Sequence, residues 1–190
     1  IEAVRLIIAD HVVQGRVILP GAGYLEMGRA LLASSDGASL RGVYFLQPLM
    51  VEDDTHVIES VLTPGGSFEV RSGEPDDAEL QSAVVHCAGQ LAPASSWATF
   101  STARHRAPDM RAVEMAPVYD ALHSGAGLQY GPGYRLLDRV WMVPQKQAAG
   151  AMRRPKAQQA DMLHPASLDG ALQLTTLIAG GDGKSTRLPF

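Results

Sequence analysis

The stretch PASLDGALQLTTLI, residues 165–178, has the character of a helix that is buried on nearly all sides. Its apolar residues cover most of the helix circumference, whereas a surface helix carries them on a single stripe. Pro165 suits the first helical turn, where no backbone N–H is needed, and Gly180-Gly181 would end the helix. The stretch PGAGYLEMGRALL, residues 20–32, repeats this pattern. The chain therefore has two candidate central helices.

Strands are expected around both helices. Runs rich in β-branched and apolar residues, bounded by glycine, proline and polar residues, predict strands at 57–62, 67–71, 80–91, 136–143 and 148–152. Residues 4–9 also have strand character, and His11 follows that run. A short helix is expected from Val118 to His123.

These elements predict an α+β fold in two halves. The halves are 1–91 and 113–190, and residues 92–112 form an Ala-, Ser-, Pro- and Arg-rich linker between them. The chain starts inside an apolar stretch and stops at Leu188-Pro189-Phe190, where a further strand would begin. We therefore interpret it as part of a larger cytoplasmic polypeptide, with a second half that is incomplete at its C-terminal end.

The composition is that of a globular domain and narrows the classes of function. The 190 residues are 46% apolar and 19% charged, enough for a hydrophobic core. A net charge of -4 argues against nucleic-acid binding, and no apolar run approaches the roughly 20 residues that span a bilayer. The single cysteine, Cys87, excludes an internal disulfide and a cysteine-based zinc site. We expect it to be a buried, unreactive thiol.

Three features carry groups capable of chemistry. His11 is one, and Asp169 is another, because it lies among apolar residues of the predicted second helix with Gln173 one turn later on the same face. A carboxylate in such a place needs partners. The third is the glycine-rich loop GLQYGPGY, residues 127–134. Structural interpretations stay open for each: a histidine at a strand edge, an aspartate that binds backbone groups, and a tight turn.

Taken in order along the chain, these features match a known family. HVVQGRVILP places His11, Gly15 and Pro20 in the register of the motif HxxxGxxxxP, and Asp169 and Gln173 match DxxxQ. The tyrosine loop is similar to GYxYGPxF, with Leu128 in place of the first tyrosine and Tyr134 in place of phenylalanine, and residues 188–190 match LPF. The chain resembles the dehydratase domains of modular polyketide synthases, which are related to fatty-acid synthase dehydratases.

The resemblance implies a double hot-dog fold, with two antiparallel sheets each wrapped around a central helix, and one active site. By resemblance, His11 from the first half removes the C2 proton, and Asp169 from the second half protonates the departing hydroxyl. Gln173 would orient Asp169, and Tyr130 would hydrogen-bond the hydroxyl. Backbone N–H groups near Gly15, or at a helix N-terminus, would stabilise the thioester carbonyl; Gly15 and Pro20 are thus also expected to orient the substrate.

The same resemblance implies the substrate and partners. A 3-hydroxyacyl group would arrive on the phosphopantetheine arm of an acyl carrier protein, and neither metal nor redox cofactor is expected. Neighbouring synthase domains and a second copy of the chain in a homodimer are the expected partners. Four alternatives remain: a pyran-forming cyclase, an enoyl isomerase, a non-catalytic dimer platform and a product template domain. The presence of Asp169 argues against an isomerase, and the His11–Asp169 pair argues against a platform.

Overall fold

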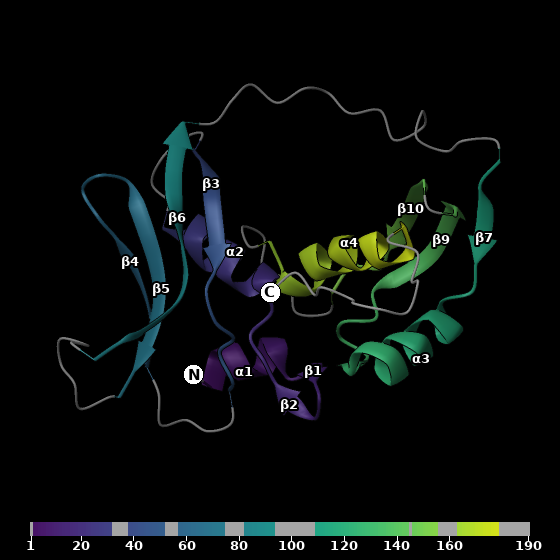
Figure 1. Cartoon of the computed structure of the whole chain (residues 1–190), viewed down its shortest axis with the longest axis horizontal. Helices are drawn as coiled ribbons and strands as arrows, with labels where there is room; N and C mark the ends of the chain where they lie inside the picture. The colour runs from purple at the N-terminus through teal and green to yellow at the C-terminus, as the bar shows by residue number, and fades with distance from the viewer. Residues whose placement is uncertain are drawn as a thin grey trace. The chain divides into compact units, whose positions relative to one another are not determined.

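The computed structural model describes residues 2–31, 38–51, 57–74, 82–93, 109–144, 146–155 and 163–178. They form two compact units (Figure 1). The first comprises the described residues within Ile1–Ala9 and Arg16–Trp97, and the second comprises those within Asp10–Gly15 and Ala98–Pro189. The two units differ from the expected halves in one respect that matters for function. The segment that carries His11 was expected in the first half, but it belongs to the second unit.

The first unit is a four-stranded antiparallel sheet with a helix packed on it. The sheet order is β3-β6-β5-β4, with bounds β3 Ala38–Phe45, β4 Val57–Leu62, β5 Ser67–Gly73 and β6 Val84–Pro93. Helix α2 (Gly21–Ala30) contacts β3 and β5, while α1 (Glu2–Ile8) and β2 (Arg16–Val17) complete the unit.

Two glycines allow helix α2 to pack closely against this sheet. The Phe68 ring is fully buried, and a Cβ placed on Gly28 of α2 or on Gly89 of β6 would come within 2.9 or 2.6 Å of it. The two glycines thus make room for one aromatic ring between helix and sheet. Cys87 lies in the same core, and burial raises the pKa of its thiol to about 11, as expected of an unreactive cysteine.

The second unit also combines antiparallel strands with a central helix. Strands β7 (Arg111–Val113), β9 (Leu137–Val143) and β10 (Gln147–Met152) form a sheet of order β10-β9-β7, and β1 (His11–Val13) pairs with β8 (Leu128–Tyr130). Helix α4 (Pro165–Ile178) packs on β9 and β10, and α3 (Met115–Ala126) packs on β8 and β9.

The predicted elements are confirmed in most places. Helix α4 and strand β4 have the predicted bounds, and α3 is longer at both ends than expected. The strand expected at 4–9 is wrong, because residues 4–8 belong to helix α1, and β3 was not predicted at all. Most of the predicted linker and all of residues 188–190 lie outside the described residues. None of the described helices has the length and apolar character needed to cross a bilayer.

Candidate active site

Pairing of β1 with β8 places His11 opposite a tyrosine. The two strands are antiparallel, with His11 paired with Tyr130 and Val13 with Leu128. Paired residues project from the same face of a sheet, so the two rings meet edge to face, with centroids 5.7 Å apart. His11 and Tyr130 are both buried. The histidine that the sequence singled out therefore begins a strand within the second unit.

Asp10 fixes the tyrosine loop against β1. Its carboxylate accepts a hydrogen bond of 2.6 Å from the Gly133 N–H, and its backbone carbonyl accepts one of 2.7 Å from the Gly131 N–H. A Cβ at Gly131 would overlap the Asp10 carboxylate, and one at Gly133 would lie 2.7 Å from it. The glycines of the loop are therefore needed for close approach, and this packing places Tyr130 and Tyr134 beside His11.

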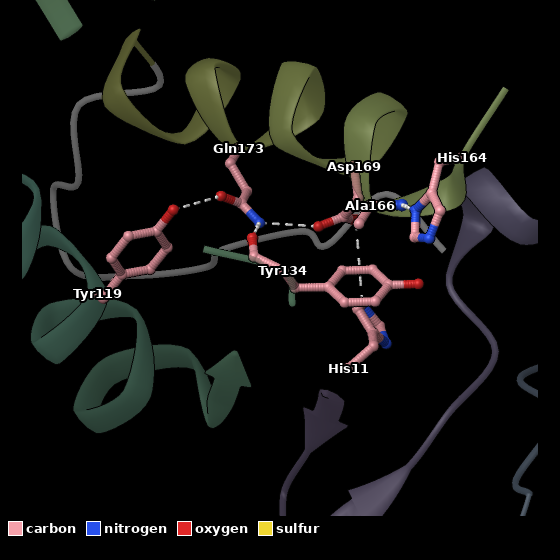
Figure 2. Close-up of polar contacts among 7 residues, drawn as sticks. All are labelled: His11, Tyr119, Tyr134, His164, Ala166, Asp169 and Gln173. Carbon is pink, nitrogen blue, oxygen red and sulfur yellow. Dashed lines mark hydrogen bonds and ion pairs between the residues drawn. The ribbon is translucent and has the colours of Figure 1, made fainter. Parts of the chain in front are cut away.

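Asp169 reaches this place from helix α4. It is buried, with 6% of its surface exposed, and its Oδ1 lies 3.9 Å from Nε2 of His11 (Figure 2). Gln173, one turn further along the helix, donates a hydrogen bond of 2.9 Å from Nε2 to Oδ2 of Asp169. The structure thus brings together four of the predicted site residues, which are His11, Asp169, Gln173 and Tyr130.

The orientation of the Gln173 amide is determined by its neighbours. Tyr119 of α3 donates a hydrogen bond of 3.0 Å to Oε1, and Nε2 donates a second one, of 3.1 Å, to the carbonyl of Tyr134 (Figure 2). A carbonyl can only accept, so the amide nitrogen must face Asp169. Oδ2 of Asp169 is then an acceptor, and Oδ1, the oxygen nearer to His11, is the one available to carry a proton.

Burial raises the pKa of the Asp169 carboxyl above its ordinary value. Loss of hydration is the largest influence, and the His11 charge and the hydrogen bonds from Gln173 and Tyr130 act in the opposite direction. The Tyr130 hydroxyl itself donates to Asp169, and burial raises the pKa of that phenol so that it stays protonated. The site therefore favours a neutral carboxylic acid close to an imidazole.

His164, which precedes α4, caps the helix that carries Asp169. It is buried, its Nδ1 accepts a hydrogen bond of 3.2 Å from the Ala166 N–H, and its carbonyl accepts one of 2.9 Å from the Ser167 N–H. Burial lowers the pKa of its ring, and an acceptor Nδ1 places the ring proton on Nε2. Capping therefore gives this buried histidine a structural role.

Gly15 differs from its expected role, whereas the role expected for Pro20 stays a prediction. Gly15 lies in an exposed turn with φ of 80°, and its N–H donates a hydrogen bond of 2.8 Å to the Gln129 side chain. That N–H therefore already has an acceptor, contrary to the expectation that it would meet the thioester carbonyl. Pro20 is part of the first unit, where it precedes α2. Sequence reasoning missed Asp10 and Tyr119, which belong to no recognised motif.

The arrangement is suited to moving two protons at neighbouring positions. An imidazole can accept one proton, and a carboxylic acid less than 4 Å away can supply another. In the part of the chain described here, no group of three or more His, Cys, Asp or Glu side chains is placed to hold a metal ion.

Comparison with known proteins gives two family matches. Residues 3–73 match the family described as polyketide synthase dehydratase domain, and residues 98–190 match the one described as polyketide synthase dehydratase N-terminal domain. Among curated proteins, the chain is 34% identical to polyketide synthase ThaG of Burkholderia thailandensis across 96% of its own length. It spans 3% of that much longer polypeptide.

Solved structures of dehydratase domains match the fold of this chain. A dehydratase domain from the CurF module of curacin polyketide synthase is 27% identical, with a TM-score of 0.73 over 94% of this chain and 68% of the other. A trans-AT dehydratase domain from Brevibacillus brevis is 25% identical, with a TM-score of 0.78 over 97% of this chain and 70% of the other. The expected α+β double hot-dog fold is confirmed.

Proposed function

This chain belongs to the family of polyketide synthase dehydratase domains, and from that premise we propose that it converts a 3-hydroxyacyl thioester into the 2-enoyl thioester. The observation that carries the proposal is the buried His11–Asp169 pair, with Nε2 and Oδ1 separated by 3.9 Å. Removing water from such a substrate takes one proton from C2 and gives one to the hydroxyl on C3, the adjacent carbon. A base and an acid held this close can remove the proton from C2 and protonate the hydroxyl on C3 of one bound substrate.

His11 is the proposed base. Its neutral Nε2 takes the C2 proton, and the electrons of the C–H bond move toward the thioester carbonyl, which gains negative charge. The rings of Tyr130 and Tyr134, with centroids 5.7 and 5.3 Å from that of His11, hold the imidazole in place. Close aromatic packing restricts the ring to one orientation and reduces the entropy lost on reaching the reactive geometry.

Asp169 is the proposed acid. As the C2–C3 double bond forms, the C3–O bond breaks, and the proton on Oδ1 passes to the leaving oxygen to give water. The Gln173 hydrogen bond to Oδ2 directs that proton to the oxygen near His11. After release of product, His11 holds the proton from C2 and Asp169 is ionised. Transfer of that proton across the 3.9 Å separation returns both groups to their starting forms.

The substrate carrier and partners follow from the type of reaction and the family. We propose that the acyl group is presented on the phosphopantetheine arm of an acyl carrier protein and that the chain acts beside other synthase domains in the cytoplasm. The relatives named polyketide synthases are far longer than this chain, in keeping with such neighbours. Proton transfer between side chains needs neither metal nor redox cofactor, and a homodimer stays a prediction.

The test of the proposal is direct. Incubation of the protein with 3-hydroxyacyl thioesters of pantetheine or of carrier protein should yield the 2-enoyl thioester, detected by mass as loss of one water. A cyclase would instead need a substrate with a second hydroxyl, so a panel of simple 3-hydroxyacyl chains distinguishes the two reactions. Failure to dehydrate every member of a panel varied in length and stereochemistry would refute the proposal.

A smaller loss is expected from Tyr130→Phe. The change removes the hydrogen bond to Asp169 and leaves the ring beside His11. A neutral hydrogen bond contributes about 0.5–1.5 kcal/mol net, so the rate should fall roughly 2- to 12-fold. Steady-state kinetics of water loss measures the effect. A loss as large as that from removing the base or the acid would mean that Tyr130 itself transfers a proton.

A further inference from the structure

We propose that the hydroxyl of Tyr134 donates a hydrogen bond to the thioester carbonyl of the substrate and stabilises the negative charge that forms there. This inference rests on the proposed dehydration and adds a residue to it. The loop motif that this chain resembles has phenylalanine at position 134, so this chain carries a hydroxyl where the motif has none.

The Tyr134 hydroxyl is buried and lacks a partner. The residue is 1% exposed, and among the described residues its hydroxyl makes no hydrogen bond. A buried phenol usually finds an acceptor, because an unsatisfied polar group is costly to bury. Because no described residue accepts its proton, the Tyr134 hydroxyl is available to donate to an oxygen of the substrate.

The position of the Tyr134 ring supports a role at the reacting atoms. Its centroid lies 5.3 Å from that of His11, and its backbone carbonyl accepts the Gln173 hydrogen bond (Figure 2). The ring therefore lies next to the proposed base, and the backbone of the same residue is held by the amide that orients the proposed acid. The carbonyl carbon of the substrate is bonded to C2, the atom that His11 deprotonates, so its oxygen must lie near His11 as well.

Four backbone N–H groups of the second unit, near Gly15 and at the start of α4, already have acceptors. The Gly15 N–H donates to Gln129, and at the start of α4 the Ala166 N–H donates to the His164 ring. Ser167 and Leu168, the next two residues of that helix, donate their N–H groups to the His164 carbonyl. The backbone groups that the sequence suggested for this task in the second unit therefore have acceptors, whereas the Tyr134 hydroxyl does not.

The chemistry requires a donor of this kind. When His11 takes the C2 proton, the electron pair delocalises onto the carbonyl oxygen, and a fixed donor in a dry site stabilises that oxygen more than it stabilises the neutral substrate. A tyrosine hydroxyl needs to keep its proton to do so. Burial raises the pKa of the Tyr134 phenol, with the Asp169 charge acting in the same direction.

The test is Tyr134→Phe, with 3-hydroxyacyl thioester substrates that carry either hydrogen or deuterium at C2. We expect kcat to fall on the order of 100-fold, as on removal of one oxyanion donor, with a melting temperature no lower than that of the wild type, because the lost hydroxyl had no partner. The C2 isotope effect on kcat/KM should be at least as large as in the wild type, because loss of this donor slows proton removal.

The outcomes separate this inference from the proposed function. Tyr44→Phe, which removes the same atom from a residue that is 67% exposed on β3, is the matched control and should leave kinetics unchanged. If the wild type dehydrates its substrate and Tyr134→Phe is equally fast, only the present inference is overturned. A slower variant with a smaller isotope effect also overturns it, since the hydroxyl would then assist departure of water. A wild type without dehydratase activity would refute the proposed function instead.

Discussion

Asp169→Asn should lose nearly all dehydration activity and keep its fold. Asparagine has the shape of aspartic acid and can still accept the Gln173 hydrogen bond, but it has no carboxyl proton to give to the leaving hydroxyl. General acid catalysis contributes about 10²- to 10⁴-fold, so we expect a fall in kcat of that size. Single-turnover kinetics of water loss, together with a thermal melt, would measure both properties.

The control for Asp169→Asn is the same substitution at an exposed position. Asp120 lies on the exposed side of α3, and Asp120→Asn should leave the rate unchanged. Turnover by Asp169→Asn at the wild-type rate would exclude Asp169 as the acid. A variant that fails to fold would be recognised from its melt.

His11→Ala should have an effect of similar size for a different reason. The change removes the group that accepts the C2 proton, and general base catalysis contributes about 10²- to 10⁴-fold. It also leaves a space beside Tyr130 and Tyr134, so some loss of stability is expected in addition. The rate of C2–H cleavage, followed with substrate deuterated at C2, isolates the catalytic effect from binding.

His123→Ala is the matched control for the base. His123 is exposed near the end of α3, and its ring contacts the Gln129 side chain. Replacing it should leave the rate of dehydration close to that of the wild type. Unchanged C2–H cleavage in His11→Ala would show that another group removes the proton, and the assignment of His11 would be wrong.

The sequence predicted the elements that have an unambiguous period or a clear boundary. Helix α4 was predictable because Pro165 marks its start and its apolar residues cover most of the helix circumference. Residues 4–9 were misread because a short, mostly apolar run fits a buried strand and a helix equally well. Strand β3 was missed because Ser39, Arg41 and Gly42 interrupt the apolar residues of its sequence, ASLRGVYF.

For the site, motif spacing identified His11, Asp169, Gln173 and Tyr130, but contacts between distant residues could not be read in the same way. Asp10 acts through its approach to Gly131 and Gly133, more than 120 residues away, and nothing in its local sequence indicates that partner. Tyr119 reaches Gln173 from a different helix. The inclusion of His11 in the second unit depends on pairing of β1 with β8, and a three-residue strand leaves little periodic signal.

The pH dependence of kcat/KM for the wild type and for Gln173→Leu tests the proposed roles of the base and the acid together, because dehydration requires a neutral His11 and a protonated Asp169 in the same molecule. Activity should rise as the imidazole loses its proton and fall at higher pH as the acid ionises, since burial raises the pKa of Asp169. The two limbs belong to the coupled pair and not to either residue alone. The hydrogen bond from Gln173 lowers that pKa, so Gln173→Leu should move the alkaline limb to higher pH and move the acid limb less. A wild-type profile that climbs steadily to high pH with no falling limb would contradict the account, because no protonated acid would then take part.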